Sequence, residues 1–220
     1  MVRAFPNDFR LLLASRSPRR SRLLRDLGVP FTVVESEAEE LLSGMAPPSL
    51  AETNAGAKAV GARLPEKADG AFVLGTDTIV VVEGRALGKP QSRREAAAML
   101  AELSGRTHEV ISGVALLRVG GRLECDHAVT GVSFARLTEE QIGAYLDSGE
   151  WTGKAGAYAI QGLAGLLIPR IEGEYANVVG LPIHLLHRLF LRHGFDLLTG
   201  SWVDVSGDFD SETGGEHQGG

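Results

Sequence analysis

The sequence carries its clearest structural signal at residues 9–20, FRLLLASRSPRR. The apolar run at residues 9–14 predicts a short buried strand. Ser17 followed by Pro18 predicts the start of a helix, because serine is a favoured N-cap and proline fits the first helical position. Gly28 is placed to end that helix. These residues therefore form a strand-to-helix junction.

The same junction predicts an anion site. Free backbone N–H groups at a helix N-terminus point toward a bound anion. Arg19 and Arg20 in the first helical turn oppose the helix dipole unless an anion lies between them. An arginine guanidinium can meet two phosphate oxygens at once, and the hydroxyls of Ser15 and Ser17 can add donors. The alternative is a solvated basic turn with a good N-cap.

Strands and helices alternate outward from this junction. Three further helices are predicted from capping boxes, in which Ser or Thr is followed three residues later by Glu or Gln. The expected fold class is α/β, one unit with a mixed sheet. The predicted strands are residues 31–34, 72–75 and 79–82 and a hairpin at 110–132 that turns at Gly120 and Gly121; the predicted helices start at Ser49, Ser92 and Thr138, and the last spans 181–193.

The C-terminal segment differs in composition from the rest. From Gly200 onward it is rich in Gly, Asp, Ser and Glu and almost free of apolar residues after Val205. Such a composition cannot bury enough apolar surface to fold. We therefore predict one folded domain at residues 1–199 and a disordered acidic tail at 200–220.

Overall composition limits the function classes. The 220 residues are 44% hydrophobic and 23% charged, which suits a soluble globular protein. A net charge of −6 without a basic stripe argues against nucleic acid as a partner. The single Cys125 excludes an intrachain disulfide framework and fits a reducing compartment. No signal peptide or membrane-spanning stretch is visible, so we expect a cytoplasmic protein without a membrane partner.

Asp77 is a candidate for phosphoryl chemistry, which needs groups that hold a metal and position water. It follows the predicted strand 72–75, within Gly-Thr-Asp-Thr. The carboxyl end of a buried strand is the usual place for a ligand site in α/β sheets. The alternative is a turn aspartate that bonds its own backbone.

Two lysines and two glutamates are further candidates. Lys58 lies on the second predicted helix, with Asn54 one turn earlier on the same face, and Lys89 lies between a glycine and a proline that fix its backbone. Either lysine alone is better explained as a surface charge. Glu39 and Glu40 follow a strand in a loop and can hold a metal, or they belong to a solvated acidic run.

Gln161 is polar within an otherwise apolar stretch. Its amide is complementary to the edge of uracil or thymine, which offers an acceptor beside a donor. Spacing alone favours the alternative, a bond to the backbone. His184 and His187 lie three residues apart on the last helix without a third ligand near in sequence, so we assign both to the helix surface or core edge.

Together these residues resemble the Maf family of nucleotide pyrophosphatases, over about residues 10–193. Several family motifs occur in the right order, which makes the resemblance specific. They are LASRSPRR (13–20), AGAKA (55–59), GTDTIV (75–80), LGKP (87–90), SGRTHEV (104–110), AYAIQG (157–162) and YANVVGLP (175–182).

The resemblance implies the mixed α/β fold of the inosine triphosphate pyrophosphatases: an elongated sheet with flanking helices in two lobes around a central cleft. It also implies a divalent metal cofactor, Mg²⁺ or Mn²⁺, and cleavage of a nucleoside triphosphate to the monophosphate and pyrophosphate. By the same resemblance, Asp77 is the catalytic residue, and Glu40 and Asp77 are the metal-side carboxylates. Four residues are implied as phosphate contacts: Ser15, Arg20, Lys58 and Lys89.

Three positions separate the sub-groups of this family by the base that they accept. Arg19, Thr78 and Gln161 occupy them here and are similar to the sub-group acting on dTTP and UTP. The sub-group acting on 7-methyl-GTP carries an aromatic residue, a glutamine and a glutamate instead. The chain departs from the family pattern at Glu39, where an Asp is usual, and in its acidic tail.

Two function classes follow from the resemblance. One is the pyrophosphatase, for which modified pyrimidine nucleotides such as 5-methyl-UTP are alternative substrates. The other is a nucleotide-binding regulator of cell division, which would need the arginines and lysines but neither Asp77 nor Glu40. Because both carboxylates are present, catalysis is favoured. The expected partner is a small nucleotide, and a homodimer is left open.

Overall fold

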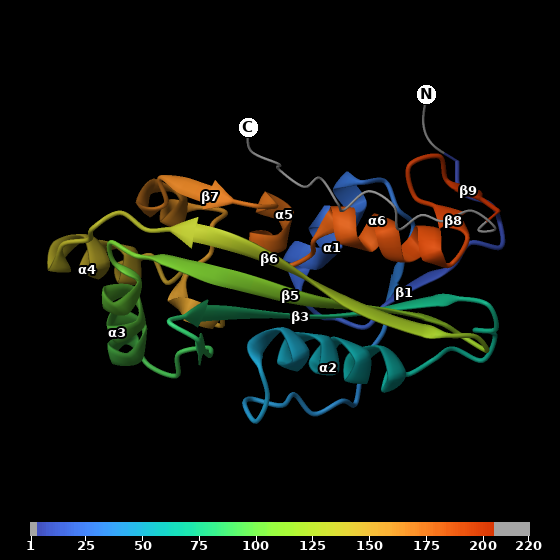
Figure 1. The fold of residues 1–220 in the computed structure, drawn as a ribbon, viewed down its shortest axis with the longest axis horizontal. Coiled ribbons are helices and arrows are strands. Elements are labelled where there is room, and N and C mark those ends of the chain that lie inside the picture. Colours follow the sequence, from blue (N-terminus) through green and yellow to red (C-terminus); the bar gives the residue numbers. More distant parts are fainter. Residues whose placement is uncertain (1–3, 205–220) are drawn as a thin grey trace, which may run out of the picture.

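The computed structural model describes residues 4–204 and shows a seven-stranded mixed sheet with helices on both faces (Figure 1). Helix α2 (Pro47–Val60) covers one face, while α1 (Pro18–Asp26) and α6 (Ile183–Arg192) lie on the other. The α/β class expected from the sequence is confirmed. The strands of the sheet are β1 (Leu11–Leu13), β2 (Thr32–Val33), β3 (Phe72–Val82), β4 (Arg85–Leu87), β5 (Thr107–Arg118), β6 (Leu123–Ser133) and β7 (Arg170–Glu172). The remaining helices are α3 (Arg93–Leu103), α4 (Glu139–Asp147), α5 (Tyr175–Val179), η1 (Ala155–Ala157) and η2 (Leu163–Leu167).

One edge of β3 is only partly paired. The strands lie in the order β2-β1-β3-β5-β6-β7, with β4 also beside β3. β1 runs parallel to residues 72–74 of β3, and β4 runs antiparallel to residues 80–82. Between them, at residues 75–79, no strand of the described chain pairs with this edge. The sheet therefore has a gap beside the middle of β3.

The sequence prediction of two separate strands at 72–75 and 79–82 is wrong. β3 is one continuous strand, and Asp77 lies in its middle, opposite Gly113 of β5, rather than at a strand end. The polar residues 76–78 stay in the strand because β5 pairs with β3 from Phe72 to Val81. Long-range pairing thus overrides the local loss of hydrophobicity.

Helix starts agree with the sequence in part. The complete capping box of Thr138 and Gln141 at α4 is confirmed. Helix α2 begins at Pro47, after Ala46, and not at Ser49 as predicted. The reason is that Pro47 and Pro48 suit the first helical turn, where no N–H bond is lost.

At α3, only one of the two hydrogen bonds of the predicted capping box forms. The Ser92 side chain accepts a hydrogen bond from the Glu95 backbone N–H at 3.2 Å. The Glu95 carboxylate, however, accepts from the backbone N–H of Gln91 rather than of Ser92. At α1, Ser17 does occupy the N-cap position and Pro18 follows it, but no side-chain cap bond forms.

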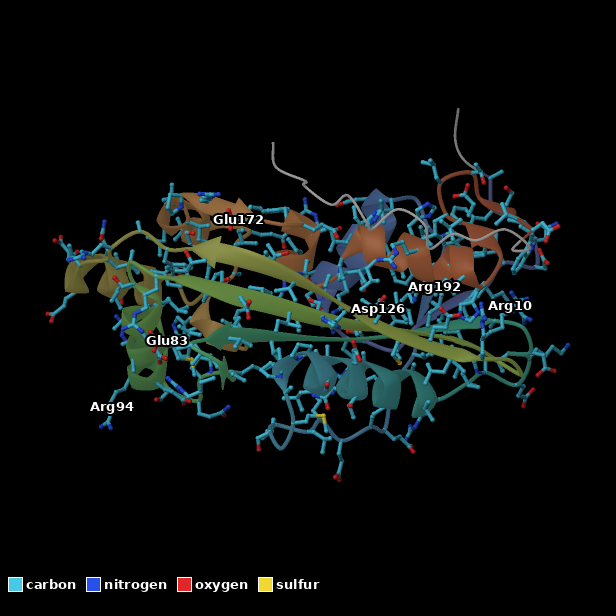
Figure 2. All side chains as sticks on the ribbon, in the orientation of Figure 1. Arg10, Glu83, Arg94, Asp126, Glu172 and Arg192 are labelled. Atoms are coloured by element: carbon cyan, nitrogen blue, oxygen red, sulfur yellow. The ribbon has the colours of Figure 1, made fainter. Side chains whose placement is uncertain are left out.

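The hairpin predicted at residues 110–132 is confirmed and is longer than expected, since β5 and β6 pair from Thr107 to Ser133. Helix α6 packs over it, and Arg192 on that helix lies 3.5 Å from Asp126 Oδ2 on β6. Figure 2 shows these two side chains beside each other where the helix lies over the strand. A partly exposed ion pair of this kind contributes little to stability.

The two largest apolar cores of the described residues occupy the two ends of the sheet. β3 and β5 contribute to both: Phe72 and Leu116 belong to the core under α1 and α6, and Val80 and Val110 to the core next to α3 and α4. The molecule therefore has two lobes joined by continuous strands. The first core also contains Leu11, Leu13, Leu24, Leu186, Leu189, Phe190 and Phe195, and the second also contains Leu100, Leu103, Phe134, Tyr145, Leu146 and Tyr158.

Helix α2 lies unusually close to the sheet at two glycines. A Cβ added to Gly75 would be 2.1 Å from the carbonyl oxygen of Ala55, and one added to Gly113 would be 2.2 Å from the carbonyl of Ala51. Both distances are far inside van der Waals contact. Only glycine therefore allows the helix backbone to rest directly on β3 and β5 beside Asp77.

The described chain continues past the predicted domain end at residue 199. β8 (Phe195–Asp196) pairs with β9 (Ser201–Trp202), and the Trp202 ring lies 6.0 Å from that of Phe72. The predicted tail therefore starts too early, because residues 201–202 form a strand. The rest of that prediction, residues 205–220, lies outside the described residues. Within residues 4–204, no helix has the length and apolar character needed to cross a bilayer.

Candidate active site

A cleft of about 880 Å³ opens at the gap beside the middle of β3. The loop between β1 and α1 lines the cleft, and so do residues from the segment 153–161. Every site residue predicted from the sequence, apart from Glu39, lines it. They are Ser15, Ser17, Arg19, Arg20, Glu40, Lys58, Asp77, Thr78, Lys89 and Gln161.

Arg20 anchors the end of the cleft that α1 faces. Its Nε donates to the Gly180 carbonyl at 2.9 Å, Nη1 to Ser15 Oγ at 3.0 Å and Nη2 to Thr78 Oγ1 at 3.2 Å. Burial lowers the pKa of Arg20 to about 10, against the opposing effect of nearby Asp77. Guanidinium has five N–H groups, so two remain for an anion.

Arg19 extends the positive charge of the same turn. Its Nε donates to the Val179 carbonyl at 3.2 Å, and burial lowers its pKa. The predicted juxtaposition of two arginines with a helix N-terminus is thus present, although Ser17 Oγ forms no cap bond. Two half-buried guanidinium groups side by side favour an anion between them.

Lys58 joins two carboxylates in the middle of the cleft. Its Nζ lies 2.7 Å from Asp77 Oδ1 and 2.7 Å from Glu40 Oε1, and its side chain is 12% exposed. Lys89 Nζ lies 3.9 Å from the other oxygen of Glu40. The structure therefore brings together the four charged residues that the sequence named separately, from α2, β3, the loop before α2 and the loop after β4.

Asn54 is the residue that the sequence analysis noted only in passing. It lies one turn before Lys58 on α2, is 3% exposed and donates from Nδ2 to Asp77 Oδ2 at 3.0 Å. It also bonds both main-chain groups of Leu41, the residue after Glu40. Its helical spacing to Lys58 was the one signal in the sequence. Its hydrogen-bond partners could not be foreseen, because they are 13 and 23 residues away in the chain.

Thr78 faces the opposite side of β3 from Asp77. Its hydroxyl lies 2.9 Å from Ser112 Oγ, which donates to the Asn177 carbonyl at 3.3 Å. Because the gap exposes the edge of β3, side chains from both faces of this strand, Asp77 and Thr78, line one cleft. Sequence analysis did not single out Ser112, a buried residue that supports Thr78, or Lys154, which lines the cleft near Arg19.

A buried histidine supports the wall formed by residues 153–161. His108 Nε2 lies 2.8 Å from the hydroxyl of Tyr158, whose side chain belongs to the cleft lining. His108 is 2% exposed, and its Nδ1 has no hydrogen-bond partner in the described structure. Burial lowers the pKa of His108 to about 4 and raises that of Tyr158.

We expect the fold to lose roughly 2–3 kcal/mol of stability between pH 7 and pH 4 through His108. Its folded pKa is below the ordinary value, so the unfolded chain binds the proton first as the pH falls. The contribution is complete above about pH 6.5 and is lost as the pH falls toward 4. Urea unfolding at several pH values measures it. His108→Gln should flatten the dependence of unfolding stability on pH between 7 and 4. The control His184→Gln, at an exposed histidine, should not. Identical profiles for the parent and His108→Gln would contradict the role given to His108.

Potential metal ligands also gather away from the cleft. Among the described residues, Glu52, Asp126 and His127 have ligand atoms within 4.8 Å of one another. His127 Nδ1 lies 2.5 Å from Glu52 Oε1, so a hydrogen bond accounts for the closeness of these two residues. His184 is exposed and His187 Nδ1 lies 3.8 Å from Asp196 Oδ1, which fits their assignment to the helix surface and core edge.

Comparisons with known proteins agree with the resemblance in sequence. The family model described as Maf-like protein matches residues 10–193. The dTTP/UTP pyrophosphatase of Symbiobacterium thermophilum is 49% identical over 193 residues, 86% of this chain and 97% of that protein. The dTTP/UTP pyrophosphatase of Moorella thermoacetica is 49% identical over 192 residues, again 86% and 97%. Among solved structures, a nucleoside-triphosphatase or dITP/XTP pyrophosphatase of Mycobacterium abscessus gives a TM-score of 0.37 at 25% identity, over 59% of this chain and 76% of that one.

Proposed function

This chain belongs to the Maf family, and we propose that it hydrolyses dTTP and UTP to the nucleoside monophosphate and pyrophosphate. The relatives named dTTP/UTP pyrophosphatase support the substrate class. The observation that carries the proposal is the meeting of Asp77 and Glu40 at Lys58, in the same cleft as Arg20. Paired carboxylates beside a triphosphate repel it unless a cation lies between them, so they favour metal-assisted catalysis over nucleotide binding alone.

The carboxylate pair fits a divalent cation. Lys58 Nζ already lies between Asp77 Oδ1 and Glu40 Oε1, which means that the space between them accepts positive charge. Carboxylate oxygens are the ligands that Mg²⁺ and Mn²⁺ prefer, usually one or two together with substrate phosphates. When bound, such a cation neutralises charge on the phosphoryl oxygens and makes water more acidic.

The reaction is the attack of water on the α-phosphorus. The bond between that phosphorus and the α–β bridging oxygen breaks, and pyrophosphate leaves while the water gives up a proton. We assign Asp77 as the acceptor of that proton, because it is the buried carboxylate on the cleft floor. Lys58 holds Asp77 Oδ1 and Asn54 holds Oδ2, so the carboxylate is oriented before the substrate binds.

The triphosphate binds to the cations of the cleft in this proposal. The two free N–H groups of Arg20, together with Ser15, lie at the N-terminus of α1, and Lys58 and Lys89 lie toward Glu40. These positions suit successive phosphates of one chain. Arg19, Thr78 and Gln161 are then left for the pyrimidine end, where the Gln161 amide complements the uracil or thymine edge.

A nucleotide panel tests the proposed function. With Mg²⁺ or Mn²⁺, we expect dTTP and UTP to be cleaved faster than purine triphosphates, each giving the monophosphate and pyrophosphate in equal amounts. Product analysis that separates pyrophosphate from phosphate is the measurement, and 5-methyl-UTP belongs in the panel. Release of inorganic phosphate with a diphosphate product would contradict attack at the α-phosphorus, and tight dTTP binding without turnover would favour the binding regulator.

A further inference from the structure

Asn54 contacts both carboxylate-bearing segments of the cleft. Nδ2 donates to Asp77 Oδ2 at 3.0 Å and to the Leu41 carbonyl at 2.9 Å, while Oδ1 accepts from the Leu41 N–H at 2.8 Å. Both amide hydrogens are therefore used. Since one of them faces a carboxylate, the amide has one orientation that satisfies all three contacts.

The loop that carries Glu40 depends on this contact. Within residues 39–45, the main-chain hydrogen bonds to the rest of the described protein are those of Leu41 with Asn54. Glu40 itself is exposed on a segment without regular structure. Its place opposite Asp77 is therefore determined mainly by the bonds of the next residue and by the flexible lysines.

The partner of this loop is rigid. Helix α2 rests on the sheet at Gly75 and Gly113, where no side chain fits between the backbones. Asn54 is thus fixed relative to β3, and it transmits that position to Leu41. Lys58 cannot replace it, because an ammonium group bonds carboxylates without a preferred direction and a divalent cation competes for the same oxygens.

We propose that Asn54 is a positioning residue that sets the spacing between Asp77 and Glu40 and thereby the affinity of the cleft for a divalent cation. The inference rests on the proposed function for its substrate but not for its metal-binding test. Residues that orient metal-side carboxylates by hydrogen bonds usually change metal affinity or activity by 10–100-fold when they are lost. The phosphate contacts proposed at Ser15 and Arg20 do not involve Asn54.

Asn54→Leu removes all three hydrogen bonds at nearly constant side-chain size. We expect the nucleotide-free variant to bind Mn²⁺ on the order of 10–100-fold more weakly, measured as free Mn²⁺ by electron paramagnetic resonance. The Mn²⁺ concentration for half-maximal turnover should rise in parallel. At saturating Mn²⁺ the KM for dTTP should stay within about threefold of the parent. A merely unfolded fraction of the variant would lower kcat alone and would leave the Mn²⁺ midpoint unchanged.

Thr53→Val is the matched control, because Thr53 is exposed on the same helix and, among residues 4–204, its hydroxyl bonds only Met45 Sδ, at 3.5 Å. It should keep the parental Mn²⁺ affinity. If Asn54→Leu does not fold, Asn54→Ala makes the same comparison with less steric change. A folded Asn54 variant with parental Mn²⁺ affinity, an equal loss in Thr53→Val, or a parent that binds no Mn²⁺ would overturn the inference. A parent that binds Mn²⁺ but cleaves neither dTTP nor UTP would refute the proposed function and leave this test standing.

Discussion

Asp77→Asn is expected to lower kcat for dTTP and UTP by a factor on the order of 10² or more. The substitution keeps the volume of the side chain and removes the charge that accepts the proton of the attacking water. Nucleotide binding should survive, and it should tighten if repulsion between the carboxylate and the phosphates is relieved. The kcat of the purified variant with both nucleotides is the measurement.

The contacts of Asp77 also predict a cost in stability. Both of its oxygens accept hydrogen bonds, one from Lys58 and one from Asn54. An asparagine must turn its NH₂ group toward one of these donors, which costs roughly 1–3 kcal/mol. A thermal melt therefore accompanies the assay, with the exposed Asp69→Asn as the matched control. A folded Asp77→Asn protein with parental kcat would transfer the chemistry to another carboxylate, of which Glu40 is the nearest candidate in the cleft.

Gly113→Ala is expected to destabilise the fold by roughly 1–3 kcal/mol or more and to reduce turnover together with it. The added Cβ would lie 2.2 Å from the Ala51 carbonyl carbon and oxygen, so helix α2 must move away from the sheet. Asn54 and Lys58 are on that helix and would move away from Asp77 with it. Chemical unfolding and kcat of the same preparation measure the two effects.

Gly131→Ala is the matched control for that experiment. Gly131 is also a strand glycine, on β6, but the nearest atom to its added Cβ is 3.7 Å away. We expect parental stability within about 0.5 kcal/mol and parental turnover. If Gly113→Ala behaved like Gly131→Ala, α2 would not be held by close backbone contact, and the argument for a rigid Asn54 would lose its basis.

The sequence predicts those features that depend on near neighbours. The strand, N-cap position and proline at residues 9–20 form the expected junction, and the capping box of α4 is complete. The polar and charged residues that the sequence singled out for the site, apart from Glu39, line one cleft in the structure. Arg19 and Arg20 conflict with the helix dipole, a local inconsistency of the kind expected at functional sites, and in the structure both line the cleft.

The gap in the sheet could not be predicted in this way. It arises because β1 and β4, which are separated by more than seventy residues, pair with different parts of one edge of β3. The polarity of residues 76–78 led to the prediction of a strand end, whereas pairing with β5 keeps them in the strand. The contacts of Asn54 were missed for the same reason, since its partners are far away in sequence.

The continuous course of β3 and β5 through both apolar cores restricts how the cleft can close. Hinges form where a few loop or terminal residues absorb large changes in φ and ψ. The floor of this cleft is instead a paired stretch of two long strands, with α2 pressed against it. The lobes therefore cannot rotate about a flexible linker, and closure over a nucleotide falls to the segments outside the sheet, residues 38–46 and 153–161.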